Sequence, residues 1–169
     1  RDLNLGRSED EVPFIWLIHL ISPSVYDEIR FGRLAAELAD LGIGVITCPS
    51  GAISMRQLRT ETSPTFNSIA RVLELLVAGV QVRIGSDNIC DITSPMGTPD
   101  LMDELFVLAN AVRYYDPDIL AHLASGRSLG AELRARVGAH IADDRASVAD
   151  AIIKIQKRAA LALQDEVNK

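Results

Sequence analysis

The sequence predicts an α/β fold built on a parallel sheet. Three short apolar runs alternate with segments of helical periodicity along the first half of the 169-residue chain. The connections between these runs are long enough to hold a crossover helix, which parallel strands require. The first run, VPFIWLI, is apolar at every position, which is typical of a strand covered on both faces. The predicted strands are residues 12–18, 43–47 and 80–84.

Local signals place the predicted helices and loops between these strands. Gly42 and Gly79 each follow a stretch of helical periodicity and supply a C-cap. Thr98 before Pro99 is expected to be the N-cap of another helix. Residues 51–63 have no period, and their length predicts a mobile functional loop. The predicted helices are residues 25–41, 64–78 and 98–114, with a second irregular loop over 88–97.

The C-terminal part of the chain has a helical pattern only. We expect a short helix after Asp116, another over residues 130–141, and a long one from Ser147. Ser147 and Asp150 have the spacing of a capping box, with Asp in place of Glu. The long helix is amphipathic, and we expect it to pack on protein rather than on a membrane.

Composition excludes several classes of function. Apolar residues make up 48% and charged residues 24% of the chain, as in ordinary globular proteins. The net charge of −6 disfavours nucleic acid as a partner. Two cysteines cannot form a disulfide framework, so we expect a reducing cytoplasm. The apolar run over residues 12–21 is about half the ~20 residues that span a bilayer, so we expect no membrane partner.

Polar residues follow each predicted strand and are the candidate site. They are His19 after the first strand, Cys48 after the second, and Ser86, Asp87 and Asn88 after the third. In parallel α/β folds these carboxyl ends lie at one edge of the sheet. Asp87 is suited to bind a metal or accept a proton from water, and His19 to orient that water. Alternatively, His19 is a structural residue, Ser86–Asn88 are turn residues, and Cys48 is a small buried apolar side chain.

The segment from His19 to about Arg113 resembles the cytosine-deaminase branch of the amidohydrolase superfamily. The similarity consists of His19 after an apolar strand, the run GIGVITCPS, the run VLELLVAGVQVRIGSDN, and then DITSPMGTPDLMDEL. Their order and spacing are similar to the sixth, seventh and eighth strands of that family's (β/α)8 barrel. The resemblance implies a partial (β/α)8 barrel of about three strand-helix units with a helical tail. We therefore expect the chain to consist of a leading segment over residues 1–11, a partial barrel unit over 12–124 and a helical extension over 125–169.

The resemblance also implies roles for residues of the candidate site. Asp87 matches the family's aspartate that binds the metal and takes part in proton transfer. His19 matches the histidine that contacts the attacking water or the tetrahedral intermediate. Ser86 and Asn88 match neighbours of the metal aspartate and are expected to bind substrate. Family members use zinc or iron to hydrolyse a C–N bond of a small heterocyclic substrate.

The sequence also departs from the family pattern. The His-x-His pair of the first strand, the histidine of the fifth strand and the catalytic glutamate have no counterpart, so we expect this chain alone to bind no zinc or iron. Alternation also places Gln81 and Arg83 on the same side as Asp87, which is the barrel interior. A guanidinium there needs a partner unless the sheet is not closed into a barrel.

Two principal interpretations of function remain open from the sequence. In the first, the chain is the C-terminal portion of a deaminase-type amidohydrolase that needs its missing N-terminal barrel half. The start at Arg1 agrees with a piece of a longer protein. In the second, it is a catalytically inactive truncated barrel that acts as an interaction module or homo-oligomer. A small binding domain for an anionic ligand ranks third, because the sequence lacks a Gly-rich phosphate loop.

Overall fold

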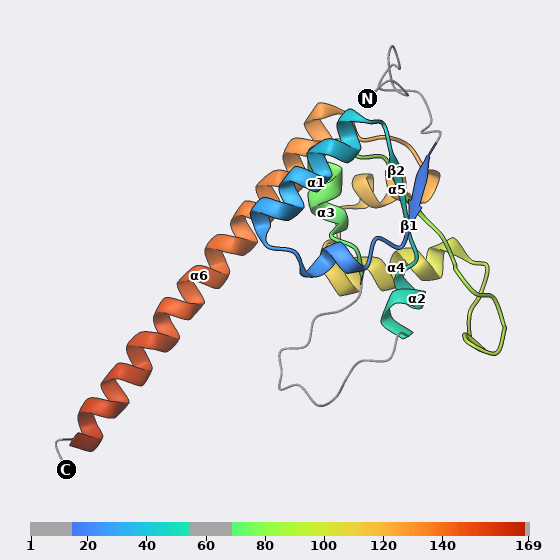
Figure 1. Cartoon of the computed structure of the whole chain (residues 1–169). Coiled ribbons are helices and arrows are strands. Elements are labelled where there is room, and N and C mark those ends of the chain that lie inside the picture. Colours follow the sequence, from blue (N-terminus) through green and yellow to red (C-terminus); the bar gives the residue numbers. More distant parts are fainter. Residues whose placement is uncertain (1–14, 55–68, 168–169) are drawn as a thin grey trace.

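A small parallel sheet with helices packed on it forms the body of the protein, and one long helix projects from that body (Figure 1). The computed structural model describes residues 15–54 and 69–167, with side chains to Leu161. The elements are β1 (Trp16–Ile18), the 3-10 helix η2 (Ser22–Val25), α1 (Glu28–Asp40), β2 (Gly44–Thr47), α2 (Pro49–Ser54), α3 (Val72–Ala78), β3 (Val82–Ile84), α4 (Leu101–Val112), α5 (Pro117–Ser125) and α6 (Ala131–Val167).

The sheet has the strand order β1-β2-β3, and both strand pairs are parallel. Val45 of β2 lies at the centre, in register with Leu17 of β1 and Val82 of β3. The predicted α/β class and parallel sheet are therefore confirmed. β1 starts at Trp16, and Ile15, predicted to be in the strand, precedes it. The predicted strand residues 12–14 lie outside the described part of the chain.

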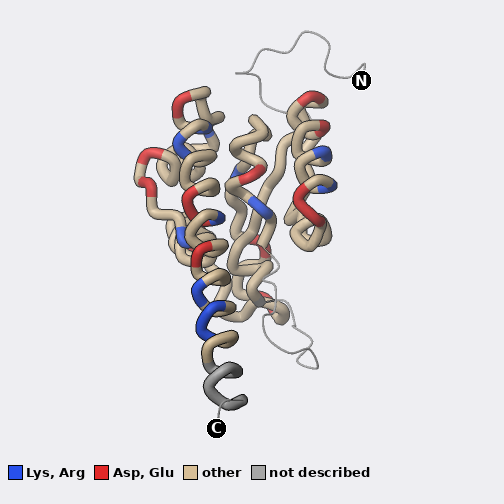
Figure 2. The backbone as a smooth tube through the Cα atoms, turned by 90° about the vertical axis from the view of Figure 1, so that its left-hand side faces the viewer, with Lys and Arg blue, Asp and Glu red and all other residues tan. Residues whose placement is uncertain are grey.

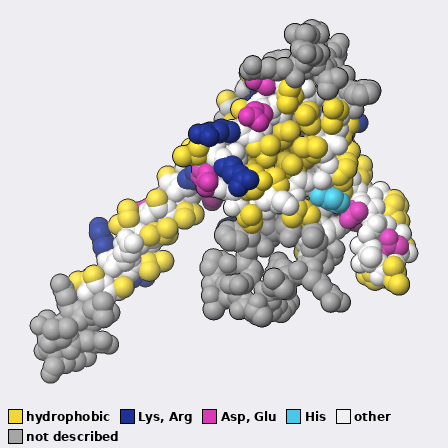
Figure 3. Space-filling view, in the orientation of Figure 1, with side chains coloured by type: hydrophobic (Ala, Val, Ile, Leu, Met, Phe, Trp, Pro, Cys, Tyr) yellow, Lys and Arg dark blue, Asp and Glu magenta, His cyan; other side chains and the backbone are white. Residues whose placement is uncertain are grey.

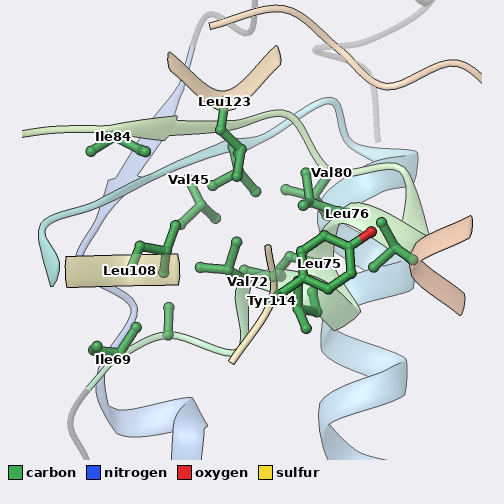
Figure 4. Close-up of a cluster of buried hydrophobic side chains, with 14 of the residues drawn as sticks. Val45, Ile69, Val72, Leu75, Leu76, Val80, Ile84, Leu108, Tyr114 and Leu123 are labelled. Atoms are coloured by element: carbon green, nitrogen blue, oxygen red, sulfur yellow. The ribbon is translucent and has the colours of Figure 1, made fainter. Parts of the chain in front are cut away.

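The hydrophobic core lies on one face of this sheet. Val45, Val82 and Ile84 point into it and are at most 8% exposed. Figure 4 shows Val45, Ile84, Leu108 and Leu123 around a shared apolar centre, with side chains from the sheet, α4 and α5. The opposite face is less covered, and Ile18 of β1 is 52% exposed there. Helices packed on one face of a parallel sheet are consistent with a partial barrel.

Two predicted helix starts are wrong because side-chain caps lie further along the chain. The helix expected from residue 25 begins after Asp27, whose carboxylate accepts a hydrogen bond from Arg30 N at 2.8 Å. The helix expected from Thr98 begins after Asp100, which accepts from Met102 N at 2.8 Å. Thr98 instead donates its hydroxyl to the carboxylate of Asp103 at 2.8 Å.

The segments around the predicted loop 51–63 also differ from expectation. Residues up to Ser54 form α2, and residues 55–63 lie outside the described ranges. The helix expected over 64–78 begins at Val72, while residues 64–68 are not described. Ile69 is buried in the core from a non-helical segment, so its apolar character reflected burial rather than helical periodicity. The C-cap at Gly79 is confirmed by its left-handed φ of 90°.

The tail contains one helix where two were predicted. α6 is continuous through the residues that separated the two predictions, so Ser147 is not an N-cap. The intervening run ADDRA contains no glycine or proline, and its residues are compatible with a helix interior. The short helix after Asp116 is confirmed as α5. Val137, in the first turns of α6, is fully buried, and this part of α6 packs against α3.

The predicted domain division at residue 125 stays a prediction. Within residues 15–54 and 69–167, no helix combines the length and apolar character needed to cross a membrane.

Candidate functional site

The polar residues that follow the three strands lie at one edge of the sheet. His19 follows β1, Cys48 follows β2, and Asp87 lies three residues beyond the end of β3. Because all pairs are parallel, these carboxyl ends point the same way. His19 N donates to Ile46 O at 2.8 Å, and this bond fixes the backbone of His19 against β2.

The structure brings His19 and Asp87 together across the end of β2. His19 Nε2 and Asp87 Oδ1 are 4.0 Å apart, and the two side chains are 33% and 29% exposed. This distance is too long for a direct hydrogen bond. An oxygen atom placed beside the line joining them could lie about 2.8 Å from both. The pair can therefore hold one polar atom of a water or a substrate.

Both members of this pair have unusual backbone conformations. His19 has a φ of 67° and Asp87 a φ of 60°, in the left-handed region that non-glycine residues rarely adopt. Leu20, beside His19, also has a positive φ of 49°. Such strain persists only where the surrounding structure holds it, and it is common at functional sites. His19 Nδ1 is buried without a hydrogen-bond partner in the described part of the protein.

Helix α2 approaches the carboxylate of Asp87 very closely. A Cβ atom on Gly51 would lie 2.3 Å from Asp87 Oδ2 and 3.1 Å from Asp87 Cβ. No side chain fits at that position without moving the carboxylate. A larger residue at position 51 would therefore displace the Asp87 carboxylate, because of this close approach rather than because of the φ of Gly51.

A buried carboxylate that was not predicted from the sequence fixes the start of helix α2, which carries Gly51. Glu104 of α4 is 3% exposed and accepts hydrogen bonds from Ser50 N, at 2.9 Å, and from Ser50 Oγ. α4 thus positions the start of α2 beside Asp87. The sequence signal was a carboxylate within an apolar helical stripe, since Leu101, Leu105 and Leu108 are on the same side of α4 as Glu104.

Cys48 is not a nucleophile in this arrangement. Its side chain is buried, as the sequence analysis expected for a small apolar residue. Burial, followed by the carboxylates of Asp87 and Glu104, raises the pKa of Cys48 from 9.0 to about 11. The thiol is therefore neutral at physiological pH, and a neutral thiol is a poor nucleophile and a poor metal ligand.

Ser86 and Asn88 lie on either side of Asp87, but Asn88 is directed into its own loop. Its Nδ2 donates to Thr93 Oγ1 at 2.6 Å. Asp91 holds the same loop by accepting from Thr93 and Ser94, and these hydrogen bonds lower the pKa of Asp91. The substrate-binding role expected for Ser86 and Asn88 stays a prediction.

Arg83 finds an aromatic partner on the open face of the sheet. Its guanidinium carbon lies 4.7 Å from the centroid of the Trp16 ring, which gives a cation–π contact between β3 and β1. Gln81, on the same face of β3, donates to Gly126 O at 3.0 Å. Arg83 Nε is buried without a hydrogen-bond partner among the described residues. The partner that the sequence required for the Arg83 guanidinium is therefore Trp16, although the Arg83 Nε donor makes no hydrogen bond to the described residues.

The donor set in the described ranges does not fit a catalytic metal. Those residues contain no cluster of three or more His, Cys, Asp or Glu side chains able to hold a metal ion. Catalytic zinc usually takes three protein ligands. Asp87 with His19 therefore falls short of a complete site, and any metal would need further ligands from outside these residues.

Comparisons with known proteins support the fold. The chain matches no protein-family model and no curated protein. The structure is similar to 5-methylcytosine deaminase from Klebsiella pneumoniae liganded with 5-fluorocytosine, with a TM-score of 0.58 and 25% identity, over 64% of this chain and 27% of that chain. It is also similar in fold to N-isopropylammelide isopropylaminohydrolase from Burkholderia multivorans, with a TM-score of 0.50 and 24% identity, over 63% of this chain and 24% of that one.

These similarities agree with the resemblance found in the sequence. They support the amidohydrolase fold for about two thirds of this chain. The chain spans only about a quarter of the length of either solved structure.

Proposed function

We propose that this chain is the C-terminal portion of a metal-dependent amidohydrolase that hydrolyses a C–N bond of a heterocycle, in the manner of a deaminase. The observation that carries the proposal is the pair His19–Asp87, 4.0 Å apart at the carboxyl edge of a parallel sheet. The likeness to a 5-methylcytosine deaminase supports the class of reaction and a small heterocyclic substrate. In the complete enzyme the helices of this chain form part of the outer layer of a (β/α)8 barrel.

Each residue of the site has a role that its position allows. In the complete enzyme Asp87 would provide one metal ligand and would accept a proton from the attacking water, because its carboxylate can reach an atom that His19 Nε2 also reaches. His19 would orient that water through Nε2 and stabilise negative charge on the water-derived oxygen of the tetrahedral intermediate. Ser86, next to Asp87 in the chain, would contact the substrate, and Asn88 would do so after releasing its hydrogen bond to Thr93 Oγ1. Zinc or iron, once bound by the complete enzyme, would activate the water.

The isolated chain is incomplete under this proposal. Among the residues that the structure describes, no further strand pairs with the outer edges of β1 and β3, and the open face carries the exposed Ile18. The missing N-terminal barrel half would cover these surfaces and supply the other metal ligands. The cytoplasm is the expected location.

The test begins with the reading frame upstream of this sequence. A His-x-His motif followed by a strand-helix pattern is expected there. The extended protein, loaded with zinc or iron, should release ammonia from cytosine or 5-methylcytosine, or an alkylamine from an alkylamino-triazine. D87N and H19N should each lower kcat/KM by about 100-fold or more, while D143N on the exposed part of α6 should not. Ammonia release by the 169-residue chain alone would contradict the need for a missing half. A D87N variant with unchanged kcat/KM would contradict the catalytic role of Asp87.

An inactive truncated barrel that acts as an interaction module is the second candidate. The incomplete set of metal donors within residues 15–54 and 69–167 and the exposed, projecting part of α6 favour it. Calorimetric titration with zinc separates the two candidates, because submicromolar binding in the chain as given would argue against an inactive module. Absence of binding in the extended protein as well would favour it.

A further inference from the structure

The outer part of α6 extends away from the body of the protein. Every described side chain from Ala142 to Leu161 is exposed. At 1.5 Å per residue this stretch is about 30 Å long. Figure 1 shows that it extends from the body without another helix or strand beside it. Arg145, near its start, reaches back to Glu28 of α1 at 2.5 Å. A helix of this length with no packed face gains little stability from its own backbone alone.

An apolar stripe follows this projecting part in a heptad pattern. Val148, Ile152, Ile155 and Ala159 are spaced by four, three and four residues, which places them in one row. The first three are 52%, 50% and 66% exposed. Figure 3 shows hydrophobic side chains along this projecting part of α6. The spacing is that of a helix packed lengthwise against another helix, and single surface residues do not produce it.

The order of charges along the projecting part of α6 favours one orientation of a partner helix. Acidic residues lie at its inner end and basic residues further out, as Figure 2 shows for the projecting end of α6. Two parallel copies would place like charges level with one another, whereas two antiparallel copies place acidic beside basic segments. The inner end carries Asp143, Asp144 and Asp150, together with Arg145, whose charge is paired with Glu28 of α1. The basic residues Lys154, Lys157 and Arg158 lie further out.

We infer that the projecting part of α6 pairs with the same helix of a second copy of this chain in antiparallel orientation. The apolar stripe forms the seam, with Ile152 of one copy level with Ile155 of the other. In this register Val148 is level with Ala159, so the larger side chains meet at the centre. The bodies of the two copies then lie at opposite ends of the helix pair and do not collide.

Sedimentation equilibrium of the 169-residue chain tests the self-association. We expect a reversible dimer of twice the monomer mass, and we expect I152D/I155D to raise its dissociation constant at least about 100-fold. I153D is the matched control, since Ile153 is 48% exposed but lies off the stripe. Both variants place Asp within the same helix, so circular dichroism should show equal helix content. A monomeric wild-type chain at all concentrations, or equal weakening by I153D, would overturn the inference.

Cysteine crosslinking tests the antiparallel orientation directly. In a C90S background, which removes the exposed cysteine, copies with V148C are mixed with copies carrying A159C and a short bismaleimide. Antiparallel pairing predicts a crosslinked product from the mixture and little from either variant alone. Efficient crosslinking of each variant with itself would show a parallel pair, and absence of any product in a dimeric sample would place the contact elsewhere.

Discussion

The hydrogen bonds between Ser50 and Glu104 should be measurable as coupled stability. Glu104 is 3% exposed, so its carboxylate depends on protein donors, and Ser50 supplies two of them. A hydrogen bond to a buried charged group contributes about 1.5–3 kcal/mol. S50A removes the hydroxyl donor and leaves the backbone donor in place, so we expect it to lower the free energy of unfolding by about 2 kcal/mol. Urea denaturation should show this as a midpoint lowered by about 1 M.

A double-mutant cycle isolates the contact itself. E104Q alone should cost about 2–3 kcal/mol, because its amide presents a donor to one of the two Ser50 donors. S50A in the E104Q background should then cost at least about 1 kcal/mol less than in the wild type. S125A is the control, since Ser125 makes an exposed hydrogen bond to Ala121 O at 2.9 Å, and its effect should stay under about 0.5 kcal/mol. Additivity of S50A and E104Q within about 0.5 kcal/mol would refute the proposed bridge between α4 and α2.

Two further substitutions probe the site. G51A should change the free energy of unfolding by less than about 1 kcal/mol, because the end of the Asp87 side chain can move away from the added methyl group. Displacing that carboxylate by about 1 Å should nevertheless lower kcat/KM of the complete enzyme about 100-fold. Its control is G32A in α1, where an added Cβ meets nothing within 4 Å and should stabilise the helix by about 0.5–1 kcal/mol without affecting activity. The pKa of Cys48 is raised from 9.0 to about 11 by burial and then by neighbouring carboxylates. The contribution of Cys48 to stability should therefore be fully present below pH 9 and be lost as the pH rises from 9 to about 11. Urea unfolding at several pH values should show this loss in the wild type and a smaller loss in C48A; an equal loss in both would assign it to other groups.

Sequence patterns were reliable where burial and chain direction leave few alternatives. Each apolar run contains a strand, and the intervening helices forced the strands to be parallel. The expectation that the first run is covered on both faces is wrong for β1, whose Ile18 is 52% exposed. The position of Asp87 after β3 and of His19 after β1 followed from those runs. Helix ends were less predictable, because Asp27 and Asp100 compete as caps with nearby residues of similar propensity, and only the actual backbone path selects one.

What the sequence by itself determined is the α/β class, the parallel order and the polar residues at the strand ends. These features follow from local periodicity and from the rule that parallel strands end at one edge. Only the tertiary structure decided that Glu104 of α4 holds Ser50, that Gly51 lies against Asp87, and that α6 continues as one exposed helix. Glu104 and Ser50 are 54 residues apart in the chain, and no local pattern specifies which distant groups meet when a core is packed.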